Sequence, residues 1–175
     1  MEFALQPFGE VAPAITITGE LVRSADNTLT VRFVVGGAVN SLSIANPAAS
    51  PERRDLLWQT TCLEFFLGVA GATNYFEFNL SPAGHWNLYA FDNYRAGMRP
   101  VATVTALPFT VEHGVEALTL TLRFNLSTLV PTEQALDVSV TSVIEERGGD
   151  ITYWALIHSH SNADFHRRDS FVGSL

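Results

Sequence analysis

Apolar and polar residues alternate with a period of two along most of this chain. The clearest run covers residues 118–126, where leucine or phenylalanine occupies every second position and threonine, arginine or asparagine lies between them. Similar runs cover residues 15–21 and 29–35. Successive side chains of a β-strand point to opposite faces, so these runs are typical of strands with one buried face. No segment shows the apolar spacing of a sustained helix.

The alternation predicts an all-β fold, namely an antiparallel β-sandwich with roughly ten short strands and little helix. Turn residues separate the predicted strands, as at Arg147-Gly148-Gly149-Asp150, where we expect the turn of a hairpin. A short lead-in strand is expected to end at Pro13. The 175 residues fit one domain that spans residues 1–175, and the hydrophobic fraction of 47% excludes a disordered chain.

The charge balance and the N-terminus limit the partners that we expect. With 10 basic and 18 acidic residues the formal net charge is −8, which disfavours binding to a phosphate backbone. The N-terminus lacks a basic segment followed by an apolar run, and no stretch is long enough to span a membrane. We therefore expect a cytoplasmic protein with no nucleic-acid or membrane partner. The single cysteine, Cys62, excludes an internal disulfide.

Two extended runs in the middle of the chain bring acidic residues together. Residues 60–69 and 74–80 flank a Gly-Ala-Thr turn and predict a β-hairpin. If the apolar faces of both strands align in the core, Glu64, Glu77 and Asn79 share the opposite face. Neighbouring carboxylates on a bare sheet repel each other. This face therefore needs a compensating group, which is an arginine, a metal, a shared proton or a ligand.

The next run, residues 84–94, is rich in aromatic residues with polar tips and is followed by Arg95. Aromatic rings stack on the apolar faces of a pyranose, while carboxylates and amides hydrogen-bond its hydroxyls. We interpret the region as a sugar site in which Trp58, Trp86 or Tyr94 supplies the stacking platform. Arg95 neutralises the acids or holds an anionic substituent in bidentate fashion. In the alternative interpretation the rings fill the core and the glutamates are solvated.

The same region carries motifs that are found in a known family. Residues 58–66 read W-x-x-T-x-x-E-x-F, and residues 75–95 read Y-x-E-F-N-L-S-P-x-G-x-W-N-x-Y-x-F-D-x-Y-R. The C-terminal part adds Y-W-A-L-I-H at residues 153–158 and A-D-F-H at residues 163–166. With these motifs most of the chain resembles the DOMON-like domains of the MurB-like group, which are relatives of the family 9 carbohydrate-binding modules. The resemblance implies a β-sandwich that binds a ligand, with sugar or haem as the expected classes.

The segment 158–166 holds three histidines and an aspartate. Alternate positions of an extended chain place His158 and His160 on one face, which suits chelation of zinc, copper or iron. The spacing fits no closed zinc motif, so a solvated loop is the alternative. The candidate metal ligands are His158, His160, Asp164 and His166. The candidate ligand-binding residues are Trp58, Glu64, Glu77, Asn79, Trp86, Tyr94, Arg95, His158, Asp164 and His166.

These observations favour a non-catalytic domain that binds a small molecule, a sugar or a sugar derivative, without a cofactor. The first alternative is a haem-binding domain of the DOMON type, with Met98 and one histidine as the axial ligands. The second is a glycoside-active enzyme that uses Glu64 and Glu77 as its acid pair, or an interaction domain without a small ligand. The sequence leaves structural calcium and the oligomeric state open.

Overall fold

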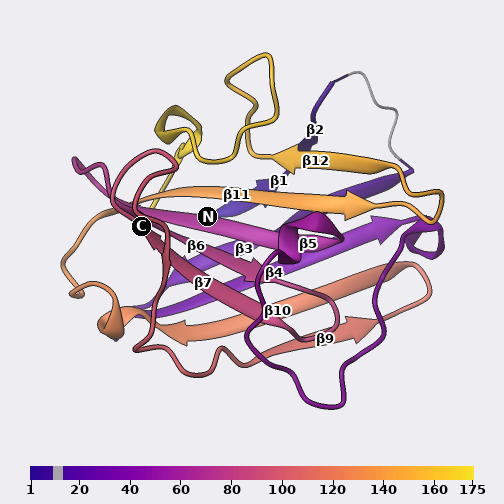
Figure 1. The fold of residues 1–175 in the computed structure, drawn as a ribbon, viewed down its shortest axis with the longest axis horizontal. Coiled ribbons are helices and arrows are strands. Elements are labelled where there is room, and N and C mark those ends of the chain that lie inside the picture. Colours follow the sequence, from indigo (N-terminus) through magenta and orange to yellow (C-terminus); the bar gives the residue numbers. More distant parts are fainter. Residues whose placement is uncertain (10–13) are drawn as a thin grey trace.

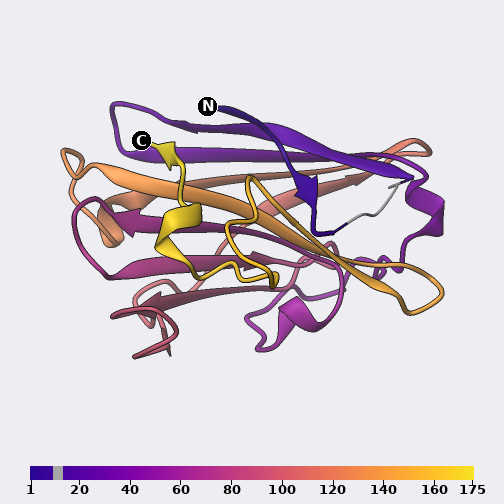
Figure 2. The same cartoon turned by 90° about the horizontal axis from the view of Figure 1, so that it is seen from above.

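The computed structural model describes residues 1–9 and 14–175, which fold into two antiparallel sheets packed face to face (Figures 1 and 2). This architecture confirms the all-β sandwich. The 13 strands exceed the roughly ten expected from the sequence, because three of them span only two residues each. Helical structure in the described residues is limited to 3₁₀ turns, and no helix there has the length and apolar character to cross a membrane. The strand end expected at Pro13 lies outside the described residues.

Every strand pairs with its neighbours in antiparallel fashion, as expected where turns and loops join the strands. The five-stranded sheet comprises, in spatial order, β1 (Glu2–Ala4), β3 (Ile15–Arg23), β4 (Thr28–Gly37), β10 (Ala117–Asn125) and β9 (Phe109–His113). The eight-stranded sheet comprises β2 (Gln6–Pro7), β12 (Ile151–Ala155), β11 (Leu136–Glu145), β5 (Cys62–Val69), β6 (Tyr75–Leu80), β7 (Trp86–Phe91) and β8 (Arg99–Pro100), with β13 (Gly173–Ser174) paired to β11.

The main core lies between the two sheets and follows the alternation of the strands. The leucines of β10, such as Leu120, are fully buried and meet the apolar face of β5 and β6. Phe65 and Phe78 stack across these two strands with their ring centroids 4.2 Å apart. Each such side chain contributes roughly 1.5–3 kcal/mol when it leaves water. The period-two pattern therefore fixes which face of each strand turns inward.

The outer face of the eight-stranded sheet is covered as well. Its central strand β5 is buried at every position from Cys62 to Gly68, on both faces. On the outer face Phe66, Tyr75 and Phe91 form a second apolar cluster with Tyr89 and Phe171. Two segments outside the sheet cover this cluster: a 3₁₀ turn at Leu57–Gln59, and the C-terminal segment drawn in yellow in Figure 1. The predicted acidic face therefore lies beneath loops.

Candidate ligand-binding site

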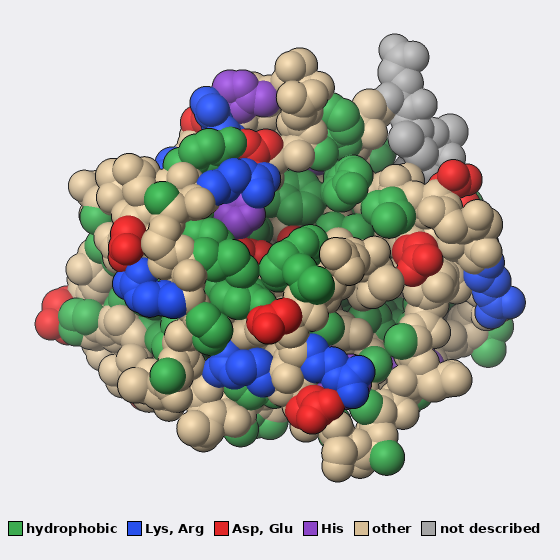
Figure 3. Space-filling model, in the orientation of Figure 1, with side chains coloured by type: hydrophobic (Ala, Val, Ile, Leu, Met, Phe, Trp, Pro, Cys, Tyr) green, Lys and Arg blue, Asp and Glu red, His purple; other side chains and the backbone are tan. Residues whose placement is uncertain are grey.

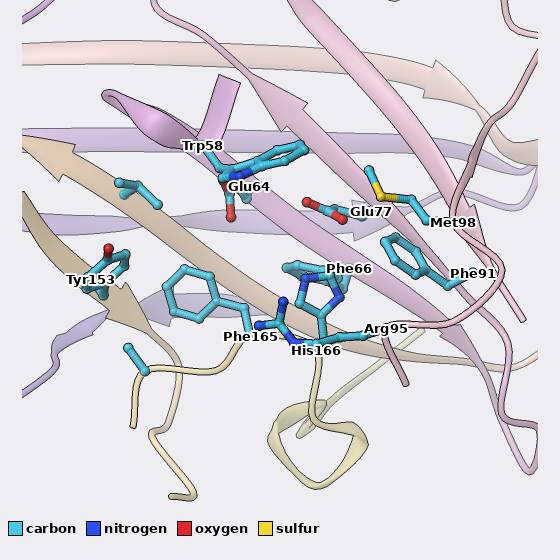
Figure 4. A pocket seen from close by; sticks show the side chains of 12 residues that line it. Trp58, Glu64, Phe66, Glu77, Phe91, Arg95, Met98, Tyr153, Phe165 and His166 are labelled. Carbon is cyan, nitrogen blue, oxygen red and sulfur yellow. The ribbon is translucent and has the colours of Figure 1, made fainter. Parts of the chain in front are cut away.

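A cavity of about 300 Å³ opens on the outer face of the eight-stranded sheet, between the covering segments (Figures 3 and 4). Strands β5 and β6 supply its base with Glu64, Phe66 and Glu77. Figure 3 shows the hollow with acidic side chains at its bottom and hydrophobic side chains around it. The volume lies at the lower end of the roughly 300–1,000 Å³ that is typical of ligand pockets, so the cavity suits a small ligand.

The two acids at the base are almost completely buried, with 1% of Glu64 and 4% of Glu77 exposed. The β5–β6 register sets Glu64 opposite Asn79, two residues from Glu77, so both carboxyl groups lie on one face of the sheet. Asn79 donates a hydrogen bond of 2.9 Å to Glu77 Oε1. Thr141 donates a bond of 3.3 Å to Glu64 Oε2. Glu64 Oε1 is buried without a hydrogen-bond partner among the described residues.

Both acids hold their protons more tightly than an exposed glutamate does. Burial raises the pKa of Glu64 to about 8, and the charge of Glu77 adds to the effect. Burial also raises the pKa of Glu77 to about 7, although the hydrogen bond from Asn79 and the charge of Arg95 act in the opposite direction. The pair therefore retains protons near neutral pH, where an exposed glutamate is ionised.

Asp164 ties the C-terminal segment to the loop that follows β7. Its carboxylate accepts a hydrogen bond of 2.6 Å from the Tyr94 hydroxyl and forms an ion pair of 2.9 Å with Arg95. It also accepts a bond of 3.2 Å from the backbone N–H of His166. Arg95 adopts a left-handed backbone conformation, with φ of 50°, which is uncommon outside glycine. These bonds hold residues 163–166 against the cavity.

His166 closes one side of the cavity as a neutral imidazole. Its Nδ1 lies 2.9 Å from the Tyr75 hydroxyl. Its ring packs edge-on against Phe66 and Phe91, at centroid distances of 5.4 and 5.1 Å. Burial and then the charge of Arg95 lower its pKa to about 4, although Asp164 acts in the opposite direction. At neutral pH the ring is therefore uncharged and can both donate and accept hydrogen bonds.

Trp58 forms the opposite side of the cavity and is held by a strained loop. It belongs to the 3₁₀ turn at Leu57–Gln59, which Leu56 precedes in a left-handed conformation with φ of 61°. The Trp58 ring packs edge-on against Tyr89 at 5.9 Å, and the Tyr89 hydroxyl donates a bond of 2.6 Å to Asp55. Bulky residues rarely adopt positive φ, and such strain gathers at functional sites.

Several of the expected site residues do not line the cavity. The expectation that Trp86 forms a stacking platform is corrected by its position. Trp86 shares a strand face with Leu88 and belongs to the main core, and the guanidinium of Arg53 lies 4.3 Å from its ring. The ring therefore offers no stacking surface to a ligand in the cavity. Asn79 lies behind the acids and is fully buried. Tyr94 is outside the lining and binds Asp164.

The histidine-rich segment does not gather into a metal site. His158 Nε2 lies 2.9 Å from the backbone carbonyl of Gln6, away from the cavity. His160 pairs with Asp169 at 3.1 Å. Across residues 1–9 and 14–175, no group of three or more His, Cys, Asp or Glu side chains is arranged to hold a metal ion. The alternate positions of His158 and His160 do not bring their imidazoles together, because each ring bonds to a different partner.

Comparisons with known proteins identify the fold. No protein-family model matches the sequence, and no curated protein matches it. A family 9 carbohydrate-binding module from Caldicellulosiruptor kristjanssonii matches in its complexes with cellotriose and glucose. The TM-scores are 0.59 and 0.56 at 14% identity, over 99% and 97% of this chain and 80% and 82% of those chains. The fold of this chain is a β-sandwich similar to that of these modules.

A second match has the same carbohydrate-binding-module fold. It is a Bacteroides uniformis protein whose proposed role is carbohydrate binding, with a TM-score of 0.62 and 14% identity over 97% of this chain and 84% of that one. At such low identity the likeness concerns the fold alone.

The cavity also includes rings that the sequence interpretation missed. Phe165 and Tyr153 line it and pack edge-on at a centroid distance of 6.1 Å. Phe91 and Met98 line it as well. A signal was present, since Phe165 lies between the two candidates Asp164 and His166.

Proposed function

We propose that this protein is a non-catalytic carbohydrate-binding domain and that the cavity over β5 and β6 holds the sugar. The observation that carries the proposal is the convergence of aromatic rings and hydrogen-bonding groups on one small cavity. Trp58 and Phe165 border it, and Glu64 and Glu77 form its base. A pyranose combines apolar faces with a rim of hydroxyls, so it needs both kinds of surface. The sugar complexes of the similar modules support this ligand class.

The polar groups of the cavity have complementary roles toward hydroxyls. A protonated carboxyl donates a hydrogen bond, while an ionised one only accepts, so the acid pair can do both. His166 has Nδ1 engaged with Tyr75, which leaves Nε2 for the ligand. Arg95 lines the cavity with a half-exposed side chain and donates from its rim. Since hydroxyls both donate and accept, this mixture suits a sugar better than a purely apolar ligand.

The placement of the acids supports binding rather than hydrolysis. A glycosidase holds the sugar bond between its two carboxyl groups. Here Glu64 and Glu77 rise from the same sheet face and form one side of the cavity. We therefore expect no turnover of chromogenic glycosides. Turnover that the Glu64→Gln variant loses would instead support a glycosidase.

A haem-binding function is the second candidate, because Met98 and His166 both line the cavity (Figure 4). A neutral imidazole and a thioether can form an axial pair. The base of the cavity fits haem poorly, since two buried carboxyl groups lie where the apolar macrocycle needs apolar contacts. Titration with haem tests this candidate: a Soret band that appears with the wild-type protein and is lost in Met98→Ala would favour haem binding.

The motifs of residues 58–95 and 153–166 also support our inference that the chain groups with the DOMON-like domains.

A ligand screen tests the proposed function directly. We expect at least one monosaccharide or short oligosaccharide to raise the melting temperature, because a ligand that binds only the folded state stabilises it. Trp58→Ala should reduce the shift. Asn46→Ala is the matched control, since Asn46 borders a different hollow with Arg147. A panel without any sugar-dependent shift, or shifts equal in both variants, contradicts the proposal.

A further inference from the structure

The cavity combines aromatic walls with an acidic base. Phe66, Phe91, Tyr153 and Phe165 line it, together with Trp58. Figure 4 shows these rings around the carboxyl groups of the acid pair. The face of an aromatic ring attracts a cation, and aromatic cages are a known means of binding substituted ammonium groups. This enclosure combines such rings with two carboxyl groups, which can balance the charge of a cation.

We propose that the ligand carries a protonated amine that binds at Glu64 and Glu77. The inference rests on the proposed function, under which the ligand is an amino sugar. The ammonium group lies at the base of the cavity, and the pyranose ring lies between Trp58 and Phe165.

The hydrogen bonds of the acid pair leave room for such a group. Glu64 Oε1 is buried and has no partner within residues 1–9 and 14–175, and an unpaired buried polar atom is costly. Glu77 has one protein donor, Asn79. An ammonium group has three donors and no acceptor, so it can satisfy oxygens of both carboxyl groups. A hydroxyl has a single hydrogen to donate and carries no charge that could balance an ionised carboxylate.

The positive charges of the site are already neutralised or absent. Arg95 pairs with Asp164 at 2.9 Å and lies at the rim. His166 is uncharged because burial and Arg95 lower its pKa to about 4. Once both acids ionise, the lining carries an excess of negative charge, which a cationic ligand can balance. An anionic ligand would face repulsion from the acids at the base.

Binding of an ammonium group should also release protons from Glu64 and Glu77. The titratable and charged groups around the acid pair are Cys62 on β5, Tyr75 on β6, Tyr89 on β7, Arg95 after β7, and Asp164 and His166 in the C-terminal segment. Near neutral pH only Arg95 and Asp164 among these are ionised, and they neutralise each other. The empty pair retains protons because burial raises the pKa of both acids. A bound cation favours their ionised forms, so protons leave as the amine binds.

The test is titration calorimetry with matched sugar triplets at pH 6.5. The probes are glucosamine, glucose and N-acetylglucosamine, with the same triplet in the galactose series. Within the series that binds, we expect the amino sugar to bind about ten-fold or more tightly than its neutral parent, because charged hydrogen bonds are the stronger ones. The acetylated sugar has no positive charge on its nitrogen, so it should not bind more tightly than the neutral parent. Titrations in two buffers of different ionisation enthalpy should show proton release for the amino sugar alone.

Variants and a simple amine complete the test. Glu64→Gln and Glu77→Gln should reduce the ratio of amino-sugar affinity to parent-sugar affinity by about ten-fold. Equal affinities within a triplet, or no proton release in the wild-type protein, overturn the inference and leave the carbohydrate-binding proposal intact. Binding of ethanolamine, whose protonated amine has three N–H donors, without binding of any sugar overturns carbohydrate binding but supports recognition of a cation. Absence of binding by every probe overturns both.

Discussion

The side-chain amide of Asn79 donates a hydrogen bond of 2.9 Å to the carboxyl group of Glu77. Glu64 stands opposite Asn79 in the strand register but has no such support, since its Oε1 lacks a partner among the described residues. Burial raises the pKa of both acids, and the hydrogen bond from Asn79 acts against this rise at Glu77. The base of the cavity therefore holds two unequal acids whose ionisation is costly.

The first prediction concerns pH and stability. A raised pKa means that the folded protein binds more protons than the unfolded chain, so stability falls as pH rises from the ordinary value of 4.5 towards about 8. Glu64→Gln removes this loss. We expect it to raise the free energy of unfolding at pH 8 by a few kcal/mol, at ~1.4 kcal/mol per pKa unit, and to change it little at pH 4. Urea unfolding across this pH range measures the effect.

His166 acts in the opposite direction at lower pH. Its folded pKa of about 4 lies below the ordinary 6.5, so its contribution to stability is lost as pH falls between these values. The change in the free energy of unfolding between pH 6.5 and 8 therefore reports on Glu64 and Glu77 and not on His166. A wild-type stability that rises across this interval would contradict the assignment of buried, protonated carboxyl groups.

The second prediction separates two tryptophans. Trp86→Ala should cost about 3–5 kcal/mol of stability, since Trp86 fills the main core. Trp58→Ala should cost about 1 kcal/mol, because Trp58 lies in a loop with its edge against Tyr89. It should nevertheless weaken sugar binding by about ten-fold through the loss of a stacking ring. Chemical unfolding and calorimetry on both variants give the comparison, and equal stability losses would reject the placement of these rings.

The third prediction concerns the attachment of the C-terminal segment. The Tyr75 hydroxyl bonds to His166 Nδ1 at 2.9 Å and accepts from the Arg95 backbone N–H at 3.2 Å. Tyr75→Phe removes both bonds and should cost about 1–3 kcal/mol. Amide hydrogen exchange should accelerate in residues 163–166. Tyr153→Phe is the control, since that hydroxyl has no hydrogen bond within the described residues, and similar exchange in both variants would show that Tyr75 does not fix the segment.

The fourth prediction uses a close contact on β5. A Cβ atom at Gly68 would lie 1.4 Å from the guanidinium of Arg168 and would displace it. Arg168 would then lose its ion pair of 2.7 Å with Asp137 and its bond of 3.1 Å to the Val69 carbonyl. Gly68→Ala should therefore lower the free energy of unfolding by about 1–3 kcal/mol. At Gly148, in a turn, an added Cβ atom would have its nearest neighbour, Asp150 Oδ2, at 4.0 Å, so Gly148→Ala should change the free energy of unfolding by less than about 0.5 kcal/mol. Equal effects of the two variants would contradict the contact.

The strands and the shared face of the acids could be predicted because they follow a local rule. Period-two alternation within β5 and β6 places Glu64 and Glu77 on the same face once the apolar faces of both strands turn to the core. The same rule could have placed Trp86 correctly. Asn87 and Tyr89 alternate with Trp86 and Leu88, so the tryptophan shares the inward face. The richness of residues 84–94 in aromatic residues led instead to the interpretation of Trp86 as a stacking ring.

The loops could not be predicted, because their positions depend on contacts far apart in the sequence. His166 is held by Tyr75, which lies 91 residues away in the sequence, so the even spacing of histidines carried no information about its position. The covering of the acidic face depends in the same way on Trp58 and Phe171 reaching the sheet from distant segments. No local period encodes such contacts.

The most direct test of a sugar site over β5 and β6 is the mapping of chemical-shift changes by nuclear magnetic resonance during titration with the best sugar from the screen. We expect the largest changes on the backbone amides of Glu64, Glu77, Arg95, Phe165 and His166. Changes concentrated elsewhere, such as around residues 39–47 and Arg147, would contradict the claim that this cavity binds the sugar.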